Sequence, residues 1–229
     1  MELAGNRHLC GVSTSPAILF FHRSAYHRAS AARLGGQRVV EALNGRAERV
    51  LCRSGLPVYR VDESAQRGAT FGARLAAATR DVFAAGHASV LIVGNDCLSL
   101  SAGLLRSAAQ RLRAGRTVLG PDHRGGSWLI GLQRADFCAD RFAALPWQTT
   151  GLLPALRATL PADSLVLLGR RSDANSLGEL LRLARDFSAA VRRALAATTA
   201  PLRPAVSRNH PRPVLTGALA HRGPPEAAR

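Results

Sequence analysis

A carboxylate directly after the most apolar short run of the chain is the leading candidate for catalysis. Residues 90–93 are all apolar, and Gly94, Asn95 and Asp96 follow them. In open α/β sheets, ligands bind at the carboxyl ends of the strands. A carboxylate at that place can bind a substrate hydroxyl or a divalent metal, because hard cations prefer oxygen ligands. The alternative is that Asp96 caps the following helix or loop, as short polar side chains often do.

Two glycine-containing segments have the composition of anion sites. In residues 120–128, the pair Gly125 and Gly126 follows Arg124. Paired glycines let a backbone approach a ligand and present N–H groups to phosphate. Residues 66–74 combine glycines and arginines ahead of a predicted helix, whose N-terminus attracts anions. The first segment is also typical of a tight turn between strands, and the second is neither a Walker loop nor a dinucleotide fingerprint.

A third candidate stands before the last predicted helix. Asp173, Ala174 and Asn175 include side-chain oxygens that a metal can use, and Ser176 and Glu179 follow them. A serine with a glutamate three residues later is typical of a capping box at a helix start. The segment therefore predicts either a metal-binding element or a helix cap.

Other catalytic classes lack their motifs. The chain contains no G-x-S-x-G or H-E-x-x-H sequence, and His87 and His123 are isolated histidines. The cysteines have none of the close spacings of a zinc knuckle or a redox motif, which favours free thiols. They are Cys10, Cys52, Cys97 and Cys138.

The composition is that of an ordinary globular protein with an unusual charge. The chain has 229 residues, of which 47% are hydrophobic and 20% charged. No apolar run approaches the ~20 residues of a membrane helix. The formal net charge is +16, yet all 31 basic residues are arginine and they are scattered. Aromatic residues make up only 5%, too few for single-strand stacking platforms, so we expect no specific nucleic-acid partner. The expected compartment is the cytoplasm.

Hydrophobic periodicity predicts alternating strands and helices that position these candidates. Runs typical of strands are residues 17–21, 56–61 (an edge strand containing Pro57), 90–93, 117–119, 128–132 and 165–168. Apolar residues at helical spacing occupy residues 37–49, 71–82, 105–112, 152–160 and 177–195. Residues 22–33 are basic and polar and predict no strong element. The alternation predicts an α/β fold with a mainly parallel sheet.

We expect one folded domain, residues 17–200, between a loose leader, residues 1–16, and a tail, residues 201–229. The leader has no periodicity. The tail contains six prolines and five arginines against one glutamate, and this composition is typical of disorder.

Four segments, taken in order, resemble a family of uncharacterised bacterial GT-A-type transferases, the arsenosugar-biosynthesis-type or radical-SAM-associated glycosyltransferases. They are residues 66–75 (QRGATFGARL), 90–100 (VLIVGNDCLSL), 120–132 (GPDHRGGSWLIGL) and 142–149 (FAALPWQT). The resemblance extends from about residue 17 to about residue 183. The run 17–21, followed by Arg23 and Ser24, resembles a branch of this family with a short N-terminus.

The resemblance implies a nucleotide-diphospho-sugar transferase fold, with helices on both faces of a mixed, mainly parallel sheet and a nucleotide pocket at the strand ends. In such folds the carboxylate after the central strand, here Asp96, binds a divalent metal or the donor sugar. The family's D-x-D-like element maps onto Asp173 and Asn175, which implies further ligands for Mg²⁺ or Mn²⁺. Residues expected to bind nucleotide or phosphate are Arg23, Gln66, Gly68, Gly72 and Arg74 by resemblance, and Arg124, Gly125 and Gly126 from the segment described above.

The chain departs from the family inside the implied pocket. Leu98 stands where the family usually has proline, and Ser127 and Trp128 stand where it has tyrosine. Arg124 stands where it has aspartate. If this arginine points inward, it repels a cation and can bind a diphosphate directly. The alternative is an outward side chain that pairs with Asp122.

Three functions remain open on these residues. The first is a metal-assisted glycosyltransferase that uses a nucleotide-sugar donor. The second is nucleotidyl transfer from a nucleoside triphosphate on the same fold. The third is a non-catalytic relative that binds a nucleotide or a partner protein, which Arg124 favours.

Overall fold

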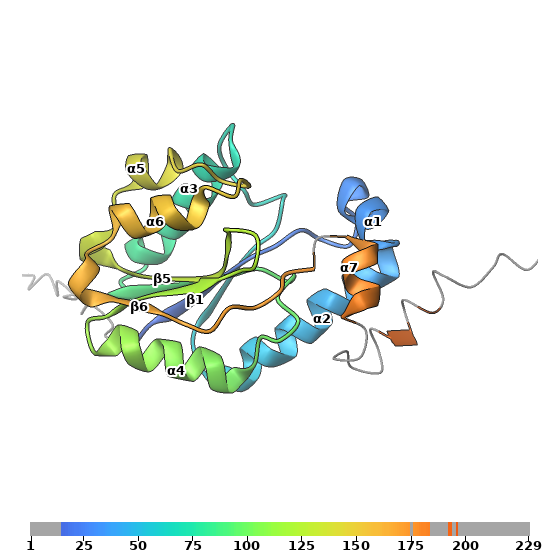
Figure 1. Ribbon diagram of the computed structural model, residues 1–229, viewed down its shortest axis with the longest axis horizontal. Helices are drawn as coiled ribbons and strands as arrows, with labels where there is room; N and C mark the ends of the chain where they lie inside the picture. The colour runs from blue at the N-terminus through green and yellow to red at the C-terminus, as the bar shows by residue number, and fades with distance from the viewer. Residues whose placement is uncertain (1–14, 175, 184–191, 194–195, 197–229) are drawn as a thin grey trace, which may run out of the picture. The chain divides into compact units, whose positions relative to one another are not determined.

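A six-stranded sheet forms the centre of the structure (Figure 1). The computed structural model describes residues 15–174, 176–183, 192–193 and 196. The strands are β1 (Ala17–Phe21), β2 (Val58–Val61), β3 (Ser89–Val93), β4 (Thr117–Pro121), β5 (Ser127–Gln133) and β6 (Leu165–Leu167). Their order is β2-β1-β3-β5-β4-β6, and β5 runs antiparallel to its neighbours β3 and β4, whereas the other pairs are parallel. The predicted α/β class with a mixed, mainly parallel sheet is confirmed.

Helices cover both faces of this sheet. They are α1 (Arg28–Leu34), α2 (Gln37–Ser54), α3 (Phe71–Ala84), α4 (Ala102–Arg113), α5 (Ala139–Ala143), α6 (Leu152–Thr159) and α7 (Leu177–Arg182). Figure 1 shows α3, α5 and α6 on one face, α2 and α4 on the other, and α1 beside α7 at one end. No helix within the described residues is both long and apolar enough to cross a membrane.

Alternate residues of the central strands divide the core into two halves. Successive side chains of a strand point to opposite faces of the sheet. Ile18 and Phe20 therefore pack with α2 and α4, whereas Ala17 and Leu19 pack with α3 and α6. Because helices cover both faces of β1 and β3, these two strands appear in the sequence as continuous apolar runs.

Serine side chains cap the two helices that follow Asp96 and Asp173 in the chain. The hydroxyl of Ser101 accepts a hydrogen bond from the Leu104 N–H at the start of α4. Asp96 therefore does not cap this helix. The hydroxyl of Ser176 accepts a bond from the Glu179 N–H at the start of α7, so the predicted cap at Ser176 is confirmed.

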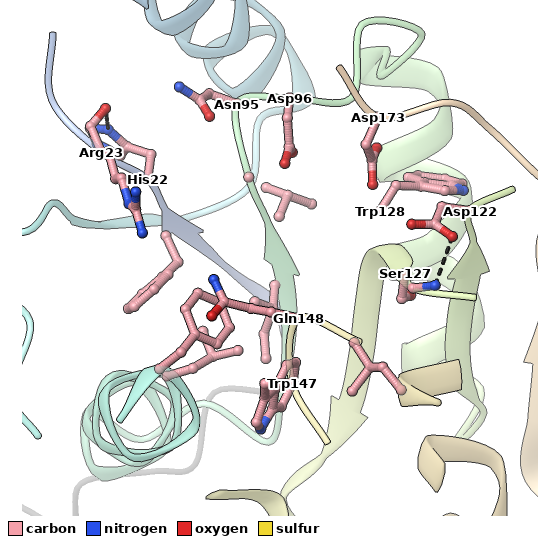
Figure 2. Close-up of a pocket in the computed structure, with 18 of the residues that line it drawn as sticks. His22, Arg23, Asn95, Asp96, Asp122, Ser127, Trp128, Trp147, Gln148 and Asp173 are labelled. Carbon is pink, nitrogen blue, oxygen red and sulfur yellow. Dashed lines mark hydrogen bonds between the residues drawn. The ribbon is translucent and has the colours of Figure 1, made fainter. Parts of the chain in front are cut away.

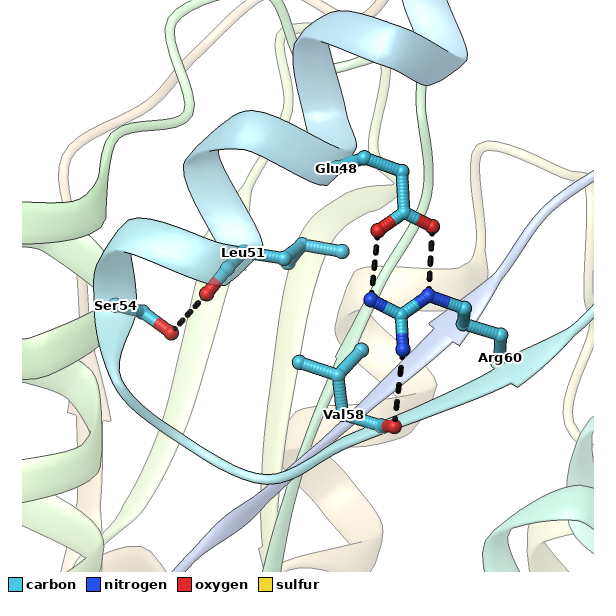
Figure 3. A network of polar contacts seen from close by, with 5 residues as sticks. All are labelled: Glu48, Leu51, Ser54, Val58 and Arg60. Carbon is cyan, nitrogen blue, oxygen red and sulfur yellow. Dashed lines mark hydrogen bonds and ion pairs between the residues drawn. The ribbon is translucent and has the colours of Figure 1, made fainter.

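An exposed ion pair joins the edge strand β2 to α2 (Figure 3). The two carboxylate oxygens of Glu48 accept bonds from the Arg60 guanidinium, both at 2.8 Å, and Arg60 also donates to the Val58 carbonyl at 3.4 Å. The Ser54 hydroxyl donates to the Leu51 carbonyl at 2.6 Å at the end of the same helix. Exposed ion pairs contribute only ~0–1 kcal/mol. The buried Leu51 side chain, which packs with Val58, therefore contributes more to holding this edge.

Two helices differ from the sequence-based expectation. α1 lies in the segment that predicts no strong element, because only Ser30 and Leu34 of this helix are buried and no apolar period results. Its ends are fixed by the His27 side chain, which accepts from the Ser30 N–H, and by Gly35 at φ 93°. α5 has five residues, too few to show a period. The predicted final helix is described only as α7, and residues 184–191 lie outside the described residues, as do leader residues 1–14 and the tail.

Candidate nucleotide and metal site

A cavity of about 560 Å³ lies at the carboxyl ends of β1, β3 and β4 (Figure 2). β3 and β4 both run antiparallel to β5, so they are parallel to each other and end at the same edge of the sheet. Loops from distant parts of the chain therefore meet there. The predicted site residues that line this cavity are Arg23, Gln66, Asp96, Arg124, Gly126 and Asp173.

The loop after β3 is held from two sides. Arg46 of α2 donates to the Leu98 carbonyl and, at 3.0 Å, to the Leu100 carbonyl. On the other side, the Ala174 N–H donates to the Asp96 carbonyl at 3.0 Å. Leu98, which replaces the proline usual in the resembling family, is 4% exposed and packs with α2 and α7. Packing and hydrogen bonds therefore fix this loop without a proline.

Asp96 and Asp173 form a carboxylate pair on one wall of the cavity (Figure 2). Asp173 forms an isolated antiparallel bridge with Cys97, which places it beside the loop of Asp96. Gly94 leaves room for the Asp96 carboxylate, because a Cβ at Gly94 would lie 2.7 Å from Asp96 Oδ1. Asp173 Oδ1 is buried and has no hydrogen-bond partner among the described residues. A buried carboxylate oxygen without a donor is stabilised by a proton or a cation.

Burial and like charges favour the protonated form of this pair. Burial raises the pKa of Asp96, and the charge of Asp122 acts in the same direction, whereas Arg33 lowers this pKa. Burial, followed by the negative charges of Asp96 and Asp122, raises the pKa of Asp173 to about 9. A divalent cation bound between the two carboxylates has the opposite effect, since it favours their charged forms.

The carboxylate pair fits a hard divalent cation that takes its other ligands from elsewhere. Mg²⁺ is commonly bound by one or two carboxylates together with waters and substrate phosphates. Among the described residues, no three His, Cys, Asp or Glu side chains lie close enough to form a metal site by themselves. Asn175, the further predicted ligand, lies outside the described residues.

Asp122 lines the cavity but is not among the predicted site residues. It follows β4 directly, is 8% exposed, and its Oδ1 accepts bonds from the N–H groups of Arg124 and Gly126, both at 2.7 Å. A Cβ at Gly126 would lie 2.6 Å from Asp122 Oδ2. Asp122 therefore shapes the turn between β4 and β5 and adds negative charge to the cavity. The available sequence signal is its place after a strand, as for Asp96.

The guanidinium of Arg124 pairs with Glu179 of α7 rather than with Asp122. Arg124 Nη1 lies 2.7 Å from Glu179 Oε1, and the arginine side chain is 52% exposed. Only the backbone N–H of Arg124 bonds the Asp122 carboxylate. Because Arg124 also lines the cavity, its positive charge lies at the cavity's solvent-exposed border and is shared with α7.

Two further arginines line the cavity. Figure 2 shows Arg23, which follows β1, across the cavity from Asp173. Arg23 Nη1 donates to the Ser30 hydroxyl at 3.4 Å. Arg33 also lines the cavity, and its charge lowers the pKa of Asp96. It is absent from the predicted set because it belongs to α1, which the sequence does not predict. Both guanidinium groups are suited to an anionic ligand.

Four predicted residues are not part of the cavity lining, namely Gly68, Gly72, Arg74 and Gly125. Gly72 lets α3 approach α5, because a Cβ there would lie 2.2 Å from the Ala143 carbonyl oxygen. Gly125, at φ 86°, would place a Cβ 2.2 Å from the Thr150 carbonyl oxygen. Arg74 Nη1 donates to the Ala69 carbonyl, just before its own helix, at 3.4 Å. These glycines permit close packing within the protein.

Gln66 and residues 147–150 also line the cavity. Gln66 donates from Nε2 to the His22 carbonyl at 3.2 Å and so fixes the chain after β1. Residues 147–150 contribute Trp147, Gln148, Thr149 and Thr150. None of these four is among the predicted site residues, although the first three lie in the resembling segment 142–149.

Solved structures of bacterial proteins resemble this chain. A putative nucleotide-diphospho-sugar transferase from Desulfovibrio desulfuricans G20 gives a TM-score of 0.67 at 20% sequence identity, over 80% of this chain and 96% of that chain. This likeness shows the fold. Rv0371c from Mycobacterium tuberculosis H37Rv gives a TM-score of 0.47 at 15% identity, over 76% of this chain and 100% of that chain. Its complex with manganese gives 0.42 at 12% identity, over 75% and 99% of the two chains.

The family of the chain follows from its sequence. No curated protein matches it. Residues 29–149, more than half of the chain, match a bacterial protein family. This match extends from α1 to the end of the segment containing Trp147 and includes Asp96, Asp122 and Arg124. The chain therefore belongs to the family described as uncharacterized protein conserved in bacteria (DUF2064).

Proposed function

We propose that this protein is a glycosyltransferase that binds a nucleotide-sugar donor in the cavity with the help of Mg²⁺ or Mn²⁺. The main support is the position of two carboxylates, Asp96 and Asp173, and two cations, Arg23 and Arg33, around a single cavity. A nucleotide sugar carries a diphosphate. The arginines can bind its oxygens directly, and the carboxylates can bind a metal that neutralises its charge. The fold shared with the Desulfovibrio protein supports this substrate class. The resemblance to arsenosugar-biosynthesis-type glycosyltransferases points the same way.

In this proposal Asp96 and Asp173 bind the metal, and Asn175 adds an oxygen ligand. The partnerless Oδ1 of Asp173 supports its role, since a cation satisfies that atom. A bound divalent cation neutralises the charge that develops on a departing nucleoside diphosphate. Asp122 remains bonded to its own turn and holds the wall of the cavity in place.

The arginines hold the phosphates of the ligand in this proposal. Arg23 and Arg33 can donate paired, charge-assisted hydrogen bonds to phosphate oxygens. Arg124 can join them by exchanging the Glu179 carboxylate for a phosphate, since its pair is half exposed and therefore weak. Binding should then depend on salt as well as on metal.

The substitution Asp96→Asn tests this proposal. Thermal unfolding is measured with nucleoside diphosphates and nucleotide sugars, each with and without Mn²⁺. A ligand at 100 times its Kd adds about 2.7 kcal/mol to the free energy of unfolding. We expect this gain in the wild type with Mn²⁺. In Asp96→Asn we expect the metal-dependent part to disappear while the ligand-free Tm changes little.

Asp163→Asn is the matched control. Asp163 is exposed and lies in the turn before β6, at the opposite end of the strands from the cavity. This variant should bind like the wild type. Unchanged Mn²⁺-dependent binding by Asp96→Asn would contradict the proposed metal site. Pyrophosphate release from a nucleoside triphosphate, with no transfer from nucleotide sugars, would indicate nucleotidyl transfer instead.

A further inference from the structure

Gln148 has an unusual backbone conformation. Its φ is 63°, and in the described part of the chain no other residue except glycine has a positive φ. This left-handed conformation is unfavourable for a residue with a Cβ, and a glutamine gains no local hydrogen bond there to offset it. Such conformations persist only where the surrounding structure imposes them, and they occur frequently at ligand sites.

The surroundings of Gln148 impose this conformation from both sides. Trp147, on one side, donates from its indole N–H to the Phe142 carbonyl at 2.8 Å. Thr149, on the other, donates from its hydroxyl to the Pro146 carbonyl at 2.7 Å. The following residues are fixed against the β4–β5 turn, where Gly125 accepts a bond from a backbone N–H of α6 at 2.8 Å.

The result is that the Gln148 side chain lies beside aromatic residues of the cavity without a hydrogen bond to the protein. Figure 2 shows Gln148 beside Trp147, across the cavity from Asp96 and Asp173. Gln148 is exposed, and its amide makes no hydrogen bond to another described residue, which leaves both amide groups free to bond a ligand. Phe21, Phe71 and Trp147 line the same cavity, and the Phe71 and Trp147 rings have centroids 5.6 Å apart.

We propose that Gln148 determines which nucleobase the cavity accepts, by bonding the polar edge of the base. This inference rests on the proposed function. An amide offers a donor and an acceptor in one plane, which matches the adjacent donor and acceptor groups on a base edge. Proteins commonly stack a base on an aromatic side chain while they bond its edge, and Trp147 beside Gln148 is such a side chain. The charged part of the nucleotide then lies toward the carboxylates and arginines.

The test compares the binding of UDP, CDP, ADP and GDP, with Mn²⁺ present, to the wild type and to two variants. Gln148→Ala and Gln148→Gly both remove the amide. We expect the wild type to prefer its best nucleotide over its worst by about tenfold, the value of one or two neutral hydrogen bonds. Both variants should lose this preference while binding the worst nucleotide as the wild type does. Gln110→Ala, on the exposed side of α4, is the matched control and should keep the preference.

Ligand-free melting tests the strain separately. Glycine tolerates the left-handed conformation and alanine does not, so Gln148→Gly should melt about 2 °C above Gln148→Ala. A preference that survives in both variants, or a wild type that binds all four nucleotides equally, would overturn the role of Gln148 and leave the proposed function intact. A wild type that binds none of them, with or without Mn²⁺, would overturn the proposed function and this inference together.

Discussion

At the scale of single residues, the central feature is a buried carboxylate pair, Asp96 and Asp173, whose pKa values burial raises and which is the metal site of the proposed function. Asp173 Oδ1 has no partner among the described residues, and Asp96 lies on the neighbouring loop. The positive charge of Arg33 opposes protonation of Asp96 but does not reverse the effect of burial. If the proposed metal binds there, it should displace a proton from the pair.

The substitution Asp173→Asn should change how stability depends on pH. The pKa of Asp173 is about 9 in the folded protein, against about 3.9 for an unfolded aspartate. Between these values the folded state holds a proton that the unfolded state has released, so stability falls as pH rises. Asparagine does not ionise. In EDTA, the variant should therefore gain stability relative to the wild type between pH 5 and pH 8, measured by urea unfolding.

The control for this prediction is Asp163→Asn, because Asp163 is exposed. Its stability difference from the wild type should be the same at both pH values. A difference for Asp173→Asn that is equally constant would mean that Asp173 is ionised in the metal-free protein.

At the scale of elements, the approach of α3 to α5 depends on one glycine. A Cβ at Gly72 would lie 2.2 Å from the Ala143 carbonyl oxygen and 2.5 Å from Trp147 Cδ1. Backbone atoms cannot give way as the far end of a flexible side chain can. We expect Gly72→Ala to lower the free energy of unfolding by about 1–3 kcal/mol, the usual cost of overpacking. Guanidinium unfolding curves at equal slope measure this loss.

Gly45→Ala is the helix-glycine control. Gly45 lies within α2, and a Cβ there meets only the end of the Arg49 side chain at 3.6 Å. Alanine should stabilise this helix by up to about 1 kcal/mol. Equal effects of the two substitutions would show that Gly72 has a propensity role and no packing role.

The long helices and central strands are predictable from sequence, because each long helix buries one whole face and each central strand is buried on both faces. β3 has five buried residues in succession, and α3 shows Leu75, Ala78 and Val82 at helical spacing. α1 is not predictable in this way, since a histidine cap and two buried residues define it. Arg33 cannot be predicted as a site residue from the sequence, because it belongs to this helix.

The candidate site is predictable in part, from places after strands and from the family resemblance, which supplied Gln66 and Asp173. Asp96 and Arg23 follow strands and line the cavity. Gly72 and Gly125 do not line it, because a glycine indicates close approach without indicating whether the neighbour is ligand or protein. Gln148 has no sequence signal, since its left-handed conformation comes from packing on either side.

At the scale of the whole molecule, the sheet order brings together the ends of β3 and β4, which Asp96 and Asp122 follow. In the sheet, β5 lies between β3 and β4, and along the chain α4 lies between them. The two strands nevertheless end at the same edge of the sheet. Asp122 therefore lies near Asp96 and Asp173 although no local pattern connects the three. Only the topology reveals this proximity.

The β4–β5 hairpin also has a consequence for the order of folding. Five residues, 122–126, connect these strands, whereas pairing β1 with β3 closes a loop of about 70 residues. The longer closure costs about 2 kcal/mol more in chain entropy, so the hairpin should form early in the transition state. Ile130→Val in β5 should therefore slow refolding, whereas Ile18→Val in β1 should mainly speed unfolding, as stopped-flow kinetics can measure. The reverse assignment would place the nucleus in the parallel strands. In this order of folding, the turn that contains Asp122 forms before β3, the strand that precedes Asp96, joins the sheet.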